Sequence, residues 1–341
     1  MNQRLVTQKE IAEQLGVSVA TVSRALNDQP GVSPKVRAEI LEAARQMGYS
    51  PDTPGRSLVT GRTHNIGYIG YKHGADLPLV HTLRGIDEEL GKLGYHMLVT
   101  YVDEEAMKKP DMLSMIRQRK VDGLILNGPA IHPRFILELR NMGLPIVLID
   151  NRLNETMVDC VLCDNEDGAY QAVGHLIEHG HEHIVFLSGP ADWLSSRERA
   201  AGYRRALQEA GLKSHIVFMP NTIVDTGYEA MLSALEKHPD LTAVMAVNDA
   251  MAVGAIRACQ QVARAVPGDV AVVGFDDGPL VQVQMPPLTT VHVYWRKIGI
   301  QAARRVVDLI EQDDRVPMQM RLAVELVIRQ SCGCHTTSKT S

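Results

Sequence analysis

The side chains best suited to chemistry in the first fifty residues lie along one short segment, residues 18–27. When this segment is written as a helix, Val19, Ala20 and Arg24 fall on or beside the face opposite its apolar stripe. Short side chains allow a helix to enter the major groove of DNA, where apolar groups contact thymine methyls and arginine can bind guanine through two hydrogen bonds. The segment therefore predicts base recognition, although an ordinary three-helix bundle with one polar face would have the same spacing.

Two flanking helices with clear end signals would position this segment. Thr7 and Glu10 form a capping box at the first helix, and Gly16 can take the left-handed conformation that ends it. Ser33 followed by Pro34 starts the third helix. Together the helices make a helix-turn-helix arrangement, in which threonine, serine and asparagine are typical phosphate contacts. The candidate DNA-contacting residues here are Thr7, Ser18, Val19, Ala20, Thr21, Ser23, Arg24 and Asn27.

From residue 65 onward, apolar strands alternate with helical segments. Near-continuous apolar runs, such as NIGYIGY at 65–71 and DVAVVGFDD at 269–277, indicate parallel sheets covered on both faces. The alternation runs through two series, which predicts two doubly wound subdomains with crossovers near 150–165 and 280–295. A last strand is expected near LAVELVIRQ at 322–330. The predicted fold is thus an all-α helix-turn-helix headpiece followed by an α/β body.

Polar and aromatic side chains gather where these strands end. In open α/β sheets, ligands bind beyond the carboxyl ends of the strands, and two subdomains would place those ends on either side of a cleft. Tyr71, Asp150, Asn248 and Asp276 each come at or directly after a strand, and the segment 193–197 opens a helix after SGP. A carboxylate, an amide and a guanidinium around an aromatic ring suit a polyhydroxylated ligand.

Total charge and composition exclude several classes of protein. The net charge is −5, but residues 1–62 carry +2, which leaves −7 for the remainder. A mildly basic head on an acidic body suits a local contact with DNA. No apolar run approaches the roughly 20 residues of a membrane span, and MNQRLVTQKE lacks the apolar core of a secretory signal. A cytoplasmic protein is expected.

The cysteine content and the absence of known catalytic motifs bear on the compartment and on the class of protein. Five scattered cysteines indicate a reducing compartment without a disulfide framework. The sequence CGCH at 332–335 could ligate a metal, but no second cluster completes a site, so we interpret 332–341 as a disordered tail. No GxSxG or HExxH motif is present. Neither an enzyme, a cofactor nor a metal site is therefore expected.

The N-terminal motifs closely resemble those of a known family. VTQKEIAEQLGVSVATVSRALN at 6–27, followed by GVSPKVRAEILEAARQMGY at 31–49 and RSL at 56–58, is similar to the headpiece of the LacI/GalR (lactose-repressor) family. The resemblance extends to about Ser331, and the body resembles periplasmic sugar-binding proteins. It implies a dimeric bacterial transcription regulator, a repressor, that binds pseudo-palindromic operators. It also implies a small effector, usually a sugar or a nucleobase.

The resemblance further implies a hinge helix at residues 51–62, between a headpiece at 1–50 and a body at 63–331. In the family, paired hinge helices enter the minor groove and a leucine wedges between base pairs, a position that Leu58 matches, with Arg56 nearby. Gly55 stands where relatives usually have alanine and Asp52 where they have asparagine, so the helix should form less readily. A plain flexible linker is the alternative.

By the same resemblance, Arg197, Asn248 and Asp276 match positions that hydrogen-bond the effector, and Asp150 matches a further pocket position. Trp193 could provide the face on which a sugar stacks, but it could equally be a packing residue. Asn248 and Asp276 could merely form turns. The candidate effector-binding residues are Tyr71, Asp150, Trp193, Arg197, Asn248 and Asp276. The alternative functions are a solute-binding protein, a nucleobase-responsive regulator, and a sugar-modifying enzyme with a DNA-binding head.

Overall fold

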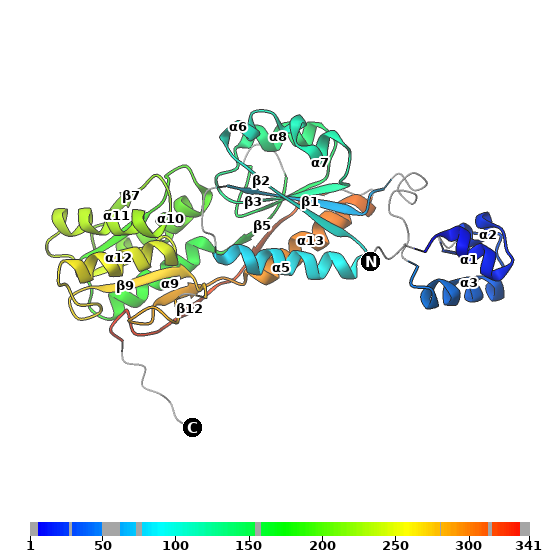
Figure 1. Ribbon diagram of the computed structural model, residues 1–341. Coiled ribbons are helices and arrows are strands. Elements are labelled where there is room, and N and C mark those ends of the chain that lie inside the picture. The colour runs from blue at the N-terminus through cyan, green and yellow to red at the C-terminus, as the bar shows by residue number, and fades with distance from the viewer. Residues whose placement is uncertain are drawn as a thin grey trace, which may run out of the picture. The chain divides into compact units, whose positions relative to one another are not determined.

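The chain is described by a computed structural model that covers residues 6–26, 29–49, 62–72, 77–153, 158–279, 281–312 and 316–334 (Figure 1). It divides into two compact units, Met1–Thr63 and His64–Ser341, called here the headpiece and the body. Residues 51–61 of the predicted hinge, including Arg56 and Leu58, lie outside the described residues.

Three helices make up the described headpiece: α1 (Gln8–Leu15), α2 (Val19–Leu26) and α3 (Pro34–Gln46). The predicted capping box is present, because Glu10 N donates to Thr7 Oγ1 at 3.4 Å and Thr7 N donates to Glu10 Oε2 at 2.7 Å. Ile11, Val22 and Ile40, one from each helix, are fully buried at the centre. The helices therefore form around a small apolar core that the 3.6-residue spacing of the sequence predicts.

The body contains two sheets, and within the described residues each has six strands. The first sheet has the order β11-β5-β4-β3-β1-β2 and the second β12-β10-β9-β8-β6-β7. The first comprises β1 (Asn65–Tyr71), β2 (His96–Val102), β3 (Gly123–Asn127), β4 (Ile146–Ile149), β5 (Asp159–Cys163) and β11 (Gln319–Leu322). The second comprises β6 (Ile184–Ser188), β7 (His215–Phe218), β8 (Ala243–Ala246), β9 (Ala271–Asp276), β10 (Thr289–His292) and β12 (Glu325–Val327). Every neighbouring pair is parallel except β10 with β12, which is antiparallel.

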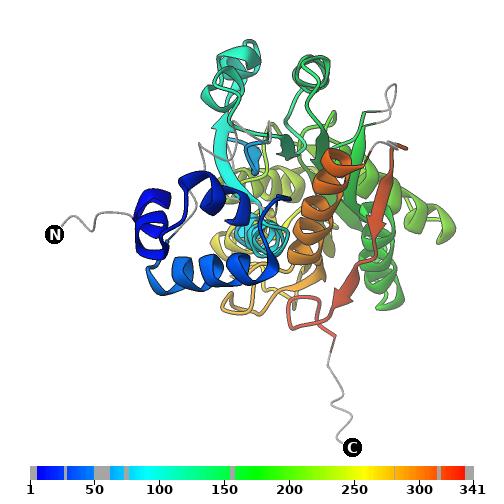
Figure 2. The same cartoon turned by 90° about the vertical axis from the view of Figure 1, so that its right-hand side faces the viewer.

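Helices cover both sheets, as the near-continuous apolar strands predict. They are α5 (Leu77–Lys92), α6 (Glu104–Met107), the 3₁₀ turn η1 (Pro110–Met112), α7 (Ser114–Arg117), α8 (Pro133–Asn141), α9 (Asn165–Glu178), α10 (Leu194–Glu209), α11 (Val224–Lys237), α12 (Asp249–Gln261) and α13 (Trp295–Glu311). Figures 1 and 2 both show α13 beside α5. Their backbones approach so closely that a Cβ on Gly85 would lie 2.2 Å from Arg296 O. No helix of the described residues is both long enough and apolar enough to span a bilayer.

The chain passes between the two sheets three times. It leaves the first sheet after β5, returns through α13 after β10, and leaves again between β11 and β12. The third passage corrects the prediction of a single last strand at 322–330. Gln319–Leu322 pairs with β5 in the first sheet, whereas Glu325–Val327 pairs with β10 in the second. Two residues between them are enough to change sheets, a step that apolar patterning does not reveal.

The end of the described chain also differs from the expectation of a disordered tail from residue 332. Cys332 is only 2% exposed, and Ser331 O accepts a hydrogen bond from Val272 N at 2.8 Å. Ser331 Oγ further donates to Val272 O at 2.6 Å. Residues 332–334 therefore pack against the second sheet because the backbone and side chain of Ser331 fasten them there; residues 335–341 lie outside the described part.

Candidate DNA-binding and effector sites

The exposed face of α2 carries the predicted DNA-contacting side chains. Val22 and Ala25 are buried, whereas Val19, Ala20 and Arg24 are exposed. Within the described residues, the Arg24 guanidinium has no ion-pair partner, so its charge faces solvent. Small side chains beside one cation give this helix the shape and charge that a major groove accepts.

The remaining predicted contacts of the headpiece have structural roles as well. Ser18 Oγ accepts from Thr21 N at 3.1 Å and lies 2.8 Å from Thr21 Oγ1, so Ser18 caps α2. Thr7 caps α1, and Ser23 lies half-buried on α2. Asn27 lies outside the described residues, as do Arg56 and Leu58.

Arg37 on α3 supports the end of α2, a role that the sequence pattern did not indicate. Its guanidinium donates to Ala25 O at 3.0 Å, to Arg24 O at 3.4 Å and to Gln29 O at 2.5 Å. The last carbonyls of a helix have no partner within the helix, and a cation there also matches the helix dipole. Arg37 therefore fixes the C-terminal turn of the helix that carries Arg24.

A cavity of about 100 Å³ in the body collects most of the predicted effector residues. The first sheet and its helices contribute Tyr71, Thr82, Asn127 and Asp150. The second contributes Trp193, Ser196, Arg199, Thr222, Asn248 and Asp276, and Trp295 lies at the start of α13. This effector cavity lies at the carboxyl ends of β1, β3, β4, β8 and β9, the location expected for a ligand in parallel α/β sheets.

Arg197 was predicted to line the cavity, but Arg199 takes that place. Arg197 is exposed and lines a neighbouring cavity of about 680 Å³. Arg199 is 4% exposed and lies on the buried stripe of α10 with Ala200 and Tyr203. The two arginines are 200° apart on a helix, so only one can face inward. The apolar stripe of α10 was the signal that could have selected Arg199.

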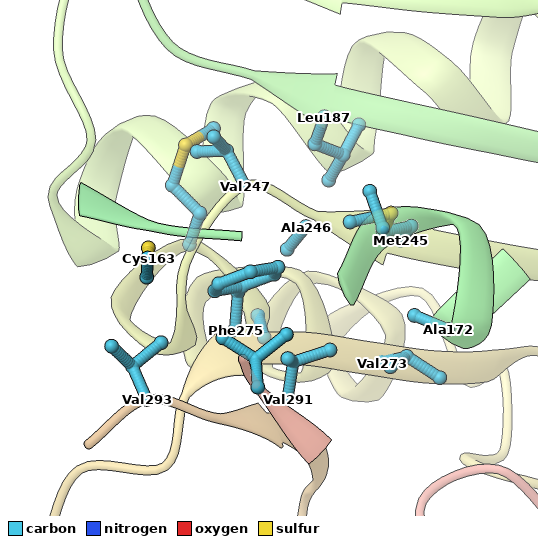
Figure 3. Packing of buried hydrophobic residues seen from close by; sticks show 14 of the residues in the cluster. Cys163, Ala172, Leu187, Met245, Ala246, Val247, Val273, Phe275, Val291 and Val293 are labelled. Carbon is cyan, nitrogen blue, oxygen red and sulfur yellow. The ribbon is translucent and has the colours of Figure 1, made fainter. Parts of the chain in front are cut away.

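Arg199 is held in place by several contacts. Its Nε donates to Asn165 Oδ1 at 2.8 Å, and its Nη1 donates to Val247 O. Its Nη2 lies 3.6 Å from Asp276 Oδ1, and its guanidinium carbon lies 3.6 Å from the centroid of the Phe275 ring. Figure 3 shows Phe275 in the apolar core of the second sheet. The guanidinium is thus fixed on one face by the ring and at its edge by a carboxylate.

The two carboxylates of the cavity sit at unusual backbone positions. Asp150 follows β4 with φ 52°, and Asp276 ends β9 with φ 112°. Non-glycine residues rarely adopt positive φ, and such strain clusters at ligand-binding sites. Asn248 Oδ1 accepts from Met251 N at 2.9 Å and caps α12, and the residue also lines the cavity.

The aromatic walls come from three directions. Tyr71 Oη donates to Glu104 Oε1 at 3.0 Å, and burial together with this carboxylate raises the pKa of the phenol. Trp193 is half-buried and borders both cavities. Trp295, which the sequence did not single out, brings a second indole to the effector cavity. Within the described residues, its buried Nε1 and the buried Oγ of Ser196 have no hydrogen-bond partner.

Asp249, directly after Asn248, is a buried carboxyl next to a residue that lines the cavity. It accepts hydrogen bonds from Thr290 Oγ1 at 2.5 Å and from Gly278 N at 2.8 Å. Burial raises the pKa of this carboxyl to about 7, although the two hydrogen bonds oppose the shift. Asp249 therefore links β10 to the turn that follows Asp276.

Comparison with known proteins identifies relatives of both the headpiece and the body. Residues 7–52 match the family of bacterial regulatory proteins described as the lacI family, and residues 173–332 match a periplasmic binding protein-like domain. The regulator CelR of Thermobifida fusca is 31% identical and catabolite control protein A of Priestia megaterium 30% identical, over 96% of this chain and 98% and 99% of theirs. The repressor PurR of Photobacterium profundum is 30% identical over 96% of this chain and 98% of its own.

Solved structures extend the likeness to the whole fold. The lac repressor dimer bound to operator and an anti-inducer superposes with a TM-score of 0.83 at 28% identity, covering 96% of this chain and 99% of that one. A CelR–cellobiose complex gives 0.74 at 29% identity, with the same coverage. These relatives are transcription regulators rather than enzymes. Regulators of this kind bind operator DNA and small-molecule effectors as dimers. With its helix-turn-helix headpiece and two-sheet ligand-binding body, the chain belongs to the LacI family of bacterial transcription regulators.

Proposed function

We propose that this protein is an operator-binding repressor whose affinity for DNA is set by a small neutral carbohydrate in the effector cavity. It works as a homodimer, since one headpiece covers only a half-site and two-fold operators match two-fold proteins. It acts on DNA in the cytoplasm. One observation carries the proposal for the ligand. The cavity is lined by two indoles and two carboxylates, and its one guanidinium, that of Arg199, already lies beside Asp276.

The charge of the cavity favours a neutral ligand. Arg199 is the only cation among the described residues that line it, and it already lies beside Asp276. Asp150 adds a second carboxylate. An anionic ligand such as a sugar phosphate would meet two negative groups for one positive group in a poorly solvated site, and burying unbalanced charge is costly.

The polar groups of the cavity suit hydroxyl groups. Carboxylates accept hydrogen bonds from hydroxyls, whereas Ser196 Oγ and Trp295 Nε1 can donate to oxygen atoms. Buried polar atoms almost always have hydrogen-bond partners in folded proteins, so we expect a ligand to supply an acceptor to each of these two donors. A sugar ring has both donors and acceptors around its edge and an apolar face for an indole. The cellobiose bound by CelR is consistent with this choice.

A nucleobase is the second candidate. Trp193 and Trp295 could stack on a planar base, and PurR repressors are among the relatives. A base offers ring N–H groups to Asp150 or Asp276 and ring-nitrogen or carbonyl acceptors to Ser196, but all of these lie in the plane of its ring, whereas the hydroxyls of a sugar project in several directions. A sugar can therefore form hydrogen bonds with more of the polar side chains in the cavity than a base can.

Effector binding is coupled to DNA through the two subdomains of the body. The cavity draws residues from both sheets, so a ligand there has different contacts in open and closed arrangements. Only such a difference in affinity can shift the equilibrium between them. The shift then changes how the headpieces and the hinge residues Arg56 and Leu58 meet the operator, with Arg24 reading a base.

The ligand class can be tested by following tryptophan fluorescence of the full chain. The panel contains neutral sugars, their phosphate and acid derivatives, and nucleobases, each also tested on Trp193→Phe and Trp295→Phe. A neutral sugar should give a saturable change, with its charged derivatives binding at least roughly tenfold weaker. Tighter binding of the acid or phosphate would contradict the neutral ligand, and a response to nucleobases alone would favour the second candidate.

The DNA claim is tested separately at fixed salt with genomic fragments that the protein retains. Specific binding should exceed non-specific binding by about 10³-fold or more, and the effector should change it by about 5–150-fold. Arg24→Ala should relax preference at one base position by about 1–3 kcal/mol, whereas Arg45→Ala, in the last turn of α3, should not. Equal binding to all fragments would refute operator recognition.

A further inference from the structure

Three potential metal ligands meet at the end of the body opposite the effector cavity. Cys332 and Cys334 follow β12, and His175 comes from the last turn of α9. Thr289, the first residue of β10, donates its hydroxyl to Cys332 Sγ at 3.1 Å. The cavity lies at the carboxyl ends of the strands and this cluster at the amino ends, about 10–13 Å away along the four residues of β10. The cluster therefore belongs to neither site described above.

The distances within the cluster are those of ligands around one ion. His175 Nε2 lies 3.5 Å from Cys332 Sγ and 3.1 Å from Cys334 Sγ, and all three atoms lie within 4.8 Å of one another. Tetrahedral zinc bonds of about 2.3 Å to sulfur and 2.0–2.1 Å to nitrogen would separate S from N by about 3.5 Å and S from S by about 3.8 Å. Both N–S distances of the cluster lie within a few tenths of an ångström of this geometry.

Each thiol of the cluster has a backbone acceptor, since Cys332 Sγ donates to Arg329 O at 3.6 Å and Cys334 Sγ to Cys332 O at 3.7 Å, but His175 Nε2 lies between the two sulfur atoms. A ring nitrogen has either one N–H or one lone pair, so Nε2 of His175 can pair well with only one of the two sulfur atoms. Both sulfur atoms nevertheless point at it. A cation at the centre would be bound by all three atoms at once, with the cysteines as thiolates.

The local backbone supports this convergence. Gly333 has φ 77°, a left-handed conformation that turns the chain so that the cysteines on either side reach the same ring. Cys332 is buried, whereas Cys334 is only partly buried, so an ion could enter from the Cys334 side. The Thr289 hydroxyl on Cys332 Sγ is the kind of outer hydrogen bond that orients metal ligands.

The other cysteines of the chain lack such an arrangement. Cys160, Cys163 and Cys259 are buried, and burial raises the pKa of each thiol to between about 11 and about 12. Cys163 Sγ donates to Asn165 Oδ1 at 3.3 Å, a bond that serine could also make. Cys163→Ser is therefore a matched control for a substitution in the cluster.

We propose that His175, Cys332 and Cys334 bind one thiophilic d¹⁰ cation, for which Zn²⁺ is the probe, and that the ion fastens the C-terminal segment to α9. Imidazole and thiolate are the ligands that zinc prefers, and three protein ligands leave a fourth position for water. The ion binds the folded arrangement and not the unfolded chain, so it stabilises the body.

The experiment uses the full chain, reduced with a metal-free phosphine and stripped with a chelator. Zn²⁺ is titrated in competition with a chromophoric chelator, and Co²⁺ is added separately to read the thiolate-to-metal absorption band. One tight equivalent per chain is expected, with a rise in melting temperature. Cys334→Ser should weaken binding roughly 100-fold or more, since loss of even an outer partner costs about 10–100-fold. Cys163→Ser should bind as the parent does.

A second variant, together with a check of folding, distinguishes loss of the metal ligands from loss of the fold. His175→Asn should also lose the tight equivalent, and far-ultraviolet circular dichroism must match the parent for both variants. Absence of a tight equivalent in the reduced parent would overturn the proposal. Equal Zn²⁺ affinity in the parent and Cys334→Ser would overturn it too, because the ion would then be bound elsewhere.

Discussion

The guanidinium of Arg199 stacks on the ring of Phe275, so the one cation that the described residues bring to the effector cavity rests on the apolar core of the second subdomain. Its position is therefore set by packing as well as by charge. A ligand that moves this guanidinium also changes its contact with the Phe275 ring, which is part of that core. This contact connects what happens in the cavity to the stability of the body.

Arg199→Met should keep much of the packing on Phe275 while removing the charge. Asp276 and Val247 O would lose a buried donor, and breaking a buried ion pair from one side costs about 3–5 kcal/mol. We expect the free energy of unfolding in urea to fall by about that amount, and the effector response to disappear. Arg197→Met, two residues earlier and exposed, should change neither. Equal effects of the two substitutions would show that the buried arginine has no special role.

Trp295→Phe should separate ligand binding from stability. The indole Nε1 is buried and has no partner within the described residues, so its removal takes away a desolvated donor while the apolar ring remains. Stability to urea should be unchanged or slightly higher. Effector affinity, measured by the fluorescence of Trp193, should fall about tenfold through loss of one hydrogen bond. A large loss of stability would mean that Nε1 is paired within the protein.

Arg37→Ala should weaken the headpiece without touching its DNA-facing side chains. The variant removes charged hydrogen bonds to carbonyls at the end of α2, each worth about 1.5–3 kcal/mol. We expect earlier thermal unfolding of the headpiece and weaker operator binding, both measured on the full chain. Arg45→Ala on the same helix breaks only an exposed pair with Glu42 and should leave the unfolding midpoint unchanged.

Asp249 should make the stability of the body depend on pH. Its pKa is raised from 3.8 to about 7 in the folded chain, so between these values the folded state keeps a proton that the unfolded state has lost. This contribution is fully present below about pH 4 and is lost as pH rises through about 7, at up to roughly 1.4 kcal/mol per pH unit.

Asp249→Asn, which mimics the protonated carboxyl, isolates this effect. Its Oδ1 can accept a hydrogen bond from Gly278 N, while its Nδ2 can donate one to the Thr290 hydroxyl. Urea unfolding of parent and variant from pH 4 to pH 8 should give curves that diverge, with the parent losing more stability toward pH 8. Parallel curves would mean that Asp249 titrates near its ordinary pKa.

Local sequence signals predicted the headpiece well because its helices begin and end by local chemistry. Thr7 with Glu10 and Ser33 with Pro34 act within three residues of themselves, so no distant contact is needed to locate the helix starts. The general position of the effector cavity was also predictable, since parallel strands bring Asp150 to the carboxyl edge of the first sheet and Asn248 and Asp276 to that of the second, whatever the details of packing.

The remaining features depend on contacts between distant parts of the chain. Arg199 and Arg197 have the same chemistry, and only the helix stripe that packs on α9 decides which faces the cavity. Trp295 reaches the cavity because α13 returns to the first subdomain, and Cys332 is ordered because Ser331 binds Val272. Patterns of apolar residues do not contain these long-range pairings. The hinge prediction for Leu58 stays a prediction.

The third passage of the chain between the sheets has a consequence for synthesis. β11 and β12 lie at residues 319–327, yet they complete the first and second sheets, respectively. A ribosome releases them after all the other described strands, so neither ligand-binding subdomain has its full set of described strands until residue 327 has emerged. The headpiece, made before the body and held by its own small core, can fold long before. A nascent regulator should therefore gain its DNA-reading fold before it gains the ability to sense an effector.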